Sequence, residues 1–143
     1  MLALLLRPKM RLRPLFSLFR SAFLPALMPL TSFDFQQARV KQVLFKSRLR
    51  SVLYGVREAE PALFSVADNP LGQWIQTVLK PQAPGQPAVR ELELVLGQML
   101  RTGQDLAARY QRGQLEEARA GLDQVNNFSD KIENLLSGLE YAA

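Results

Sequence analysis

Apolar side chains recur at alternating steps of three and four residues from about residue 33 onward, which is the spacing of one face of a helix. In the first helix this inner face consists of Phe35, Ala38, Gln42, Phe45, Leu49 and Val52. Gln42 is the only polar member of the series. We expect Asp34 to cap the helix, with Gln37 three residues later completing a capping box, and Gly55 to end it. The pattern therefore predicts a helix over about residues 33–55.

A less regular segment follows, and then a second long helix. Residues 60–80 predict one or two short helices with a turn at Asp68-Asn69-Pro70, and residues 80–87 predict a loop rich in proline, glycine and glutamine. A helix over about residues 87–112 would begin with Pro87, which suits a first helical turn because the missing N–H has no partner there. Its inner stripe, with Leu100 beside it, consists of Leu92, Leu96, Met99, Gly103, Leu106 and Tyr110.

The last predicted helix follows a break at Gly113 and carries an unbroken heptad seam. The seam consists of Leu115, Ala118, Leu122, Val125, Ser129, Ile132, Leu136 and Leu139. Neither a strand-like alternation nor a glycine-rich phosphate loop occurs in the sequence. The sequence therefore predicts an all-α fold, an antiparallel four-helix bundle with a short irregular helical second element.

Residues 1–30 differ from the rest of the chain in charge and in proline content. They contain five basic residues, no acidic residue and four prolines, so the net charge of +5 is confined to this segment and the remainder is neutral. We predict a basic apolar tail over residues 1–31, either disordered or forming a short interfacial helix, and a helical domain over residues 32–141.

The tail is too interrupted to cross a membrane, because a spanning helix needs about 20 consecutive apolar residues. It could still make a weak contact with a membrane surface or a partner through an apolar face and its arginines. The residues expected in this contact are Arg11, Arg13, Phe16, Phe19, Arg20 and Phe23. The alternative is that residues 1–27 do not belong to the native protein, and that Met10 or Met28 is its true start.

The chain contains neither cysteine nor histidine, which removes several kinds of chemistry. Disulfides and thiolate sites are excluded, and the absence of cysteine fits a reducing cytoplasm. No imidazole is available as a general base and no serine has an adjacent base, so we expect no enzymatic activity. The neutral body lacks a basic stripe with interleaved aromatic residues, so we expect no nucleic-acid binding.

Two segments resemble the chemoreceptor zinc-binding (CZB) domain of bacterial signalling proteins. The first runs from Phe33 through Ala38 and Gln42 to Lys46, and the second is Asn69-Pro70-Leu71-Gly72-Gln73-Trp74. The family has an Ala-x-x-x-His-x-x-Trp-Lys stretch and a Cys-x-Leu-Gly-x-Trp stretch. Gln42 stands where the family has its histidine, and Asn69 stands where it has its cysteine.

The resemblance also implies two further histidine ligands four residues apart on the third helix. Counting back from Gly113 places them at about Leu96 and Leu100. Zinc requires imidazole, thiolate or carboxylate donors, and none of these four positions supplies one, so we expect neither zinc nor another cofactor. Glu91 and Glu93 lie near the third helix's positions in sequence but would occupy different helix faces and form no zinc cage.

Each of these positions also has a purely structural interpretation. Leu96 and Leu100 fit the core of a bundle, and Gln42 fits a buried amide that bonds to Asn69, Ser129 or the backbone. Asn69 fits a turn residue and helix cap. Phe45, Leu71 and Trp74 fit packing positions or the wall of a pocket. A basic cluster on the first helix fits a solvated face and consists of Arg39, Lys41, Lys46, Arg48 and Arg50.

The resemblance implies a non-catalytic regulatory, sensory or protein-interaction domain of cytoplasmic bacterial signalling. Its partner would be a chemoreceptor, a cyclic-dinucleotide enzyme or a second copy of the chain. One alternative is a small-molecule sensor with an apolar pocket around Leu96, Leu100 and Trp74. Another is a membrane-surface adaptor that uses residues 1–30.

Overall fold

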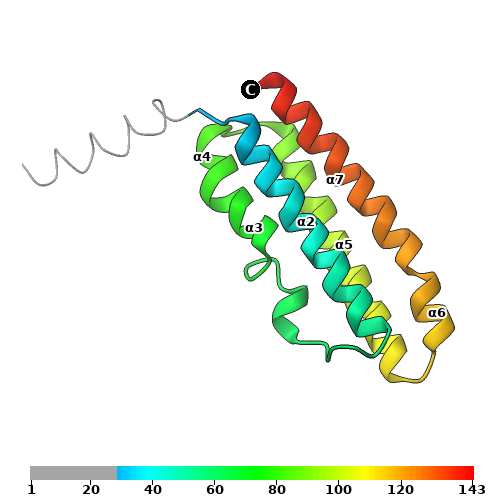
Figure 1. Ribbon diagram of the computed structural model, residues 1–143. Helices are drawn as coiled ribbons and strands as arrows, with labels where there is room; N and C mark the ends of the chain where they lie inside the picture. Colours follow the sequence, from blue (N-terminus) through cyan, green and yellow to red (C-terminus); the bar gives the residue numbers. More distant parts are fainter. Residues whose placement is uncertain (1–28) are drawn as a thin grey trace, which may run out of the picture.

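The computed structural model describes residues 29–143, and every regular element among them is helical. The elements are α2 (Ser32–Leu53), a 3-10 turn (Pro61–Phe64), α3 (Pro70–Trp74), a π-helical turn (Ile75–Leu79), α4 (Lys80–Gln82), α5 (Pro87–Gln111), α6 (Leu115–Ala120) and α7 (Leu122–Ala142). The long helices α2, α5 and α7 lie side by side, and the run from α3 to α4 packs beside α2 and α5 (Figure 1). The predicted all-α class is confirmed.

The inner face of α2 is confirmed, but its cap differs from the prediction. All six predicted inner positions are buried. The N-cap is Thr31 rather than Asp34: the Thr31 hydroxyl accepts from the Asp34 backbone N–H at 3.4 Å, and the Asp34 carboxylate accepts from the Thr31 backbone N–H at 2.9 Å. Asp34 is thus the third residue of a reciprocal capping box, and Gln37 takes no part in it. Gly55 follows the end of α2 with a φ of 75°, a left-handed conformation that glycine adopts without steric cost.

The irregular second element is more helical than the sequence pattern indicated. After the 3-10 turn, α3 continues through the π-helical turn into α4, so Lys80–Gln82 belong to a helix and not to the predicted loop. Pro81 is the second residue after the π-helical turn. In a regular α-helix its ring would collide with the carbonyl four residues earlier, and the wider π turn relieves this collision. The Lys80 ammonium then contacts the Glu93 carboxylate of α5 at 2.7 Å.

The predicted fourth helix is divided at Gly121. α6 ends at Ala120 and α7 begins at Leu122, so two helices stand where a single helix with an unbroken seam was expected. A side chain at Gly121 would collide with the side chain of Leu106 on α5, so the bend brings the backbone of the last helix against α5. Leu115 is exposed and Leu122 is half-buried, whereas the seam is buried from Val125 onward.

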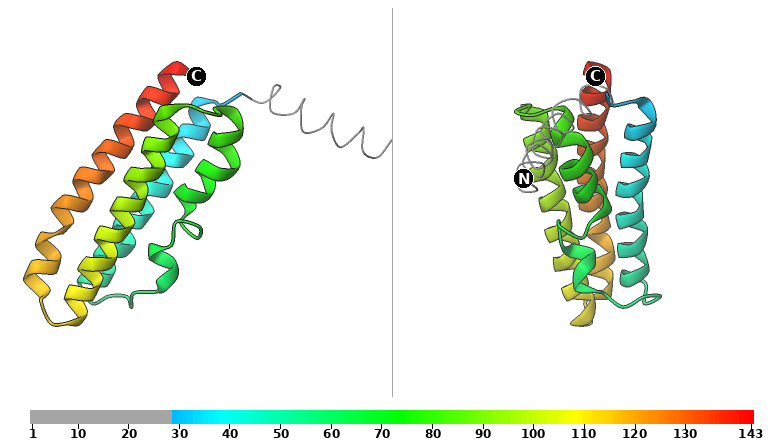
Figure 2. Two further views of the ribbon diagram at one scale, coloured as in Figure 1. Left: turned by 180° about the vertical axis from the view of Figure 1, so that it is seen from behind. Right: turned by 90° about the vertical axis from the view of Figure 1, so that its left-hand side faces the viewer.

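The element ends meet in two groups at opposite ends of the molecule. At one end, the start of α2, the end of α4, the start of α5 and the end of α7 surround a hollow that Leu30, Leu79, Gln86 and Leu139 help to line. At the other end, the Arg119 guanidinium of α6 donates to the Leu53 carbonyl at 2.9 Å. Figure 2 shows both ends from behind and from the side. An arginine at the carboxyl end of α2 also complements the partial negative charge of that helix end.

The apolar core runs the length of the molecule and contains buried residues of α2, α3, the π-helical turn, α5, α6 and α7. Its fully buried larger side chains are Phe35, Leu49, Leu53, Leu71, Ile75, Leu79, Leu92, Leu96, Met99, Leu100, Ile132 and Leu136. Within residues 29–143, no helix has the length and apolar content needed to cross a bilayer.

The capping box makes the start of the folded domain testable. A chain that begins at Met28 retains Leu30, Thr31 and every buried position of α2, so its helical circular dichroism and its melting temperature should match those of the full chain. A matched chain that begins at Phe33 lacks the Thr31 cap and should lose about 1 kcal/mol of unfolding free energy. If the chain from Met28 is unfolded, the tail belongs to the core and the boundary at residue 31 is wrong.

Candidate functional site

Asn69 caps α3 from a buried position. Its side-chain oxygen accepts from the backbone N–H groups of Leu71 at 2.9 Å and Gly72 at 3.1 Å, and the residue is 3% exposed. Pro70 follows as the first residue of the helix, where its missing N–H leaves nothing unsatisfied. The interpretation of Asn69 as a turn residue and cap is confirmed. The side-chain oxygen of Asn69 is therefore already bonded to two backbone N–H groups at the start of α3.

The Leu-Gly-x-Trp stretch is explained by packing. Leu71 is fully buried, and Trp74 meets Phe35 of α2 edge to face with ring centroids 5.8 Å apart. A side chain at Gly72 would collide with the backbone carbonyl of Val66. The segment before α3 therefore folds back onto the first turn of the helix, and only a glycine leaves room for it.

Gln42 crosses from α2 to α7 through a buried hydrogen bond. The Ser129 hydroxyl donates to the Gln42 side-chain oxygen at 2.7 Å, and the two residues are 5% and 2% exposed. Of the partners expected for Gln42, the structure selects Ser129, a member of the α7 seam. A buried amide without such a partner would be costly, so this bond lets a polar residue occupy an apolar seam.

Leu96 and Leu100 lie in the core of α5. Each is 1% exposed and belongs to the main apolar cluster, which confirms their interpretation as core residues. Three hollows within residues 29–143 are lined by residues other than these two leucines. One of these, of about 90 Å³, lies between α2 and residues 57–70 and includes Phe45 and Asn69. None of the three is lined by Leu96, Leu100 or Trp74.

The four positions that the resemblance assigns to zinc ligands therefore have separate structural partners. Gln42 bonds to α7, Asn69 bonds to α3, and Leu96 and Leu100 pack in the core on α5. Among residues 29–143, no three histidine, cysteine, aspartate or glutamate side chains gather closely enough to hold a metal ion. The tail residues expected to contact a membrane or a partner, Arg11 to Phe23, lie outside the described part of the chain.

The basic cluster of α2 is not uniformly solvated, because Arg39 is tied to α7. Its guanidinium donates to Glu133 at 2.6 Å and to Glu140 at 2.8 Å, with a longer bond to Ser137 at 3.3 Å. The hydrogen bonds to Glu133 and then Glu140 raise the pKa of Arg39 above its usual value. The expectation of a solvated face is wrong for this residue. Glu133 and Glu140 are seven residues apart, which is two helix turns, and this spacing could have indicated a pair of carboxylates on one face of α7.

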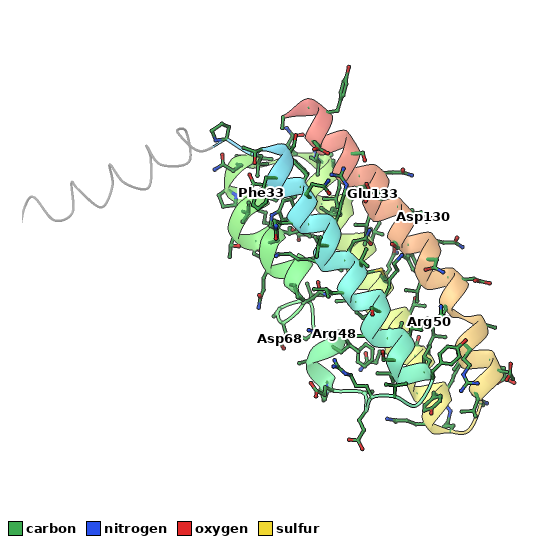
Figure 3. The ribbon with its side chains drawn as sticks, in the orientation of Figure 1. Phe33, Arg48, Arg50, Asp68, Asp130 and Glu133 are labelled. Carbon is green, nitrogen blue, oxygen red and sulfur yellow. The ribbon has the colours of Figure 1, made fainter. Side chains whose placement is uncertain are left out.

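The other cations of the cluster, which include Arg48 and Arg50 in Figure 3, form no ion pair with a described residue. Arg50 lies over the ring of Tyr54, 5.3 Å from its centroid.

Comparison with models of known families, with characterised proteins and with solved structures finds no match.

The bond between Gln42 and Ser129 should be strongly coupled. Ser129→Ala leaves the buried oxygen of Gln42 without its donor and should lower the unfolding free energy by about 1–3 kcal/mol. The double variant Gln42→Met with Ser129→Ala removes both polar groups and should regain most of that loss. Denaturant unfolding of the parent, both single variants and the double variant measures the coupling energy. Additive effects would show that the bond does not hold α2 to α7.

Two glycines should respond in opposite ways to the same substitution. Gly72→Ala forces the Val66 backbone to move and should cost about 1–3 kcal/mol. Gly97→Ala is the matched control, because its new methyl group meets nothing within 4 Å and alanine favours the interior of α5. It should stabilise the protein by about 1 kcal/mol. Thermal unfolding of both variants is the measurement, and a Gly72→Ala protein as stable as the parent would refute the close approach.

Proposed function

We propose that residues 32–141 form a zinc-independent member of the CZB class, an antiparallel four-helix bundle that acts as a regulatory or protein-interaction domain. Two features support the arrangement. The element ends gather in two groups at opposite ends of the molecule, and α2, α5 and α7 contact one another along their length. The sequence segments that resemble the family lie at the start of α3 and along the inner face of α2.

The observation that carries the proposal is the way in which the four former ligand positions are filled. The Gln42 and Ser129 pair joins α2 to α7, Asn69 serves as a cap, and Leu96 and Leu100 supply apolar packing. Structural zinc contributes on the order of 10 kcal/mol to the folding of small zinc domains. In this chain the same positions contribute through hydrogen bonding and apolar burial, which need no metal.

A domain of this kind would act through contacts with other proteins. We propose a bacterial, cytoplasmic setting and a signalling partner such as a chemoreceptor or a cyclic-dinucleotide enzyme, with a second copy of the chain as the alternative partner. The main support is the resemblance of the α2 and α3 segments. The exposed face of α2, which carries apolar and basic side chains, is a candidate surface for such a contact.

Restoring the ligands tests the family assignment. The variant Gln42→His, Asn69→Cys, Leu96→His and Leu100→His supplies one thiolate and three imidazoles, the donors of a tetrahedral zinc site. Without metal it should lose roughly 2–5 kcal/mol for each core leucine replaced. Zinc should then restore most of this loss, as measured by thermal unfolding and by titration calorimetry.

Two controls define the outcome. A variant with only Gln42→His and Asn69→Cys has two protein donors and should bind zinc more weakly. Sets with the helix α5 pair moved by one residue or by one turn test its register. If no register binds zinc tightly while the metal-free variants remain folded, the four positions do not converge and the CZB assignment fails.

A further inference from the structure

One hollow combines buried residues at its base with charged residues of both signs at its mouth. It has a volume of about 90 Å³ and lies between α2 and the segment that connects α2 to α3; we call it the α2–α3 hollow. Phe45 and Asn69 line it and are only 2% and 3% exposed, so the hollow reaches inward from the surface to the core. The half-buried Leu63 of the 3-10 turn lines it as well. Its charged lining residues are all exposed, and they are Arg48, Arg57, Glu58, Glu60 and Asp68.

The charges of the α2–α3 hollow do not neutralise one another. In the part of the chain that the structure describes, neither of its two arginines and none of its three carboxylates takes part in an ion pair. Arg48 lies on α2 and Asp68 lies just before α3, and both are labelled in Figure 3. The hollow therefore offers cations and anions from different segments to a molecule that enters it.

These features restrict the ligand to a small molecule that carries both signs of charge. A purely anionic ligand would be repelled by the three carboxylates, and a purely cationic one would be repelled by the two arginines. Among residues 29–143, these carboxylates do not gather closely enough to hold a metal ion. An apolar cavity of about 150 Å³ holds benzene, so this smaller hollow admits a short apolar group and excludes a nucleotide or a helix of a partner protein.

We propose that the α2–α3 hollow binds a free α-amino acid with a short apolar side chain, such as valine. The ligand's carboxylate pairs with Arg48 and Arg57, its ammonium group pairs with the carboxylates of residues 58–68, and its side chain packs near Phe45 and Leu63. All three groups of an α-amino acid branch from one carbon atom, so both charges stay at the mouth when the side chain enters. The proposal goes beyond the function proposed above, because it gives the domain a small-molecule ligand and does not depend on the CZB assignment.

Three ligands that share one apolar group test the proposal on the full chain. Valine has both charges, isobutylamine has only the ammonium group, and isovalerate has only the carboxylate. Titrations followed by two-dimensional NMR of the backbone amides should show saturable shifts at the residues that line the hollow. Valine should bind roughly tenfold or more tightly than either analogue, because each analogue lacks one set of charge-assisted hydrogen bonds. Glycine, which lacks the apolar group, should also bind roughly tenfold or more weakly than valine.

Neutral variants of the two sets of charges identify the site. Arg48→Gln with Arg57→Gln should weaken valine binding by roughly tenfold or more, and it should not weaken binding of isobutylamine. Glu58→Gln with Asp68→Asn should also weaken valine binding, and it should not weaken binding of isovalerate. A loss of structure would weaken all three ligands alike, so this crossed pattern separates contact with the ligand from an effect on folding.

The matched control neutralises two exposed arginines of α5 that line none of the three hollows, Arg90→Gln with Arg101→Gln. It should change the affinity for valine less than about twofold, because exposed charges far from a site are screened by solvent and salt. Circular dichroism of each variant verifies that it is folded.

Three results would overturn the proposal. The first is valine that does not bind, or that binds no more tightly than either analogue. The second is valine binding that the charge variants of the hollow leave unchanged, or whose NMR shifts lie elsewhere. The third is strong coupling between the two sets of substitutions in unfolding experiments without ligand, because the arginines and carboxylates then pair with each other. These experiments use the parent ligand positions and no zinc, so this proposal and the CZB assignment can fail separately.

Discussion

A buried amide in the middle of an apolar seam constrains how α2 and α7 can pack. Within residues 29–143, Gln42 has only Ser129 as a side-chain partner, and both residues are at most 5% exposed, so water has little access to the bond. A shift of one helix along the other would separate the hydroxyl from the amide oxygen and leave both unsatisfied, whereas leucine pairs would tolerate small shifts. The polar pair therefore fixes the register of the two helices. Arg39, bonded to Glu133 and Glu140, fixes the same register nearer the end where α7 terminates.

This register determines the positions of the other elements. α3 packs on α2 through the contact of Trp74 with Phe35, and α5 packs against both α2 and α7. Close backbone approaches reinforce the arrangement, because Gly103 on α5 faces the rings and methyl groups of Phe45 and Leu49. Each of these contacts depends on the position of α2 along its own axis relative to α7. α2 thus contacts α3, α5, α6 and α7, and its polar inner residue sets its position against α7.

The sequence predicted the elements whose cause is local and repetitive. The inner faces of α2 and α5 follow from apolar spacing, and burial of Leu96 and Leu100 and capping by Asn69 follow from the same kind of reasoning. The differences between the predicted and the observed elements have causes that the spacing of apolar residues does not reveal. The break at Gly121 depends on the distant Leu106, and the role of Arg39 depends on two carboxylates about a hundred residues away. The helical state of Lys80–Gln82 depends on a π turn that accepts Pro81, which a proline rule based on regular helices does not anticipate.

The two faces of α2 differ in what a substitution there should change. Residues of the inner seam are nearly all without solvent contact, so a change there acts on the free energy of folding. Val40, Val43 and Leu44 on the opposite face are 41% to 56% exposed, so a substitution there should change the free energy of folding little. Because α3, α5, α6 and α7 all contact α2, a change on its inner face reaches most of the fold, whereas a change at the exposed Val40 or Val43 does not.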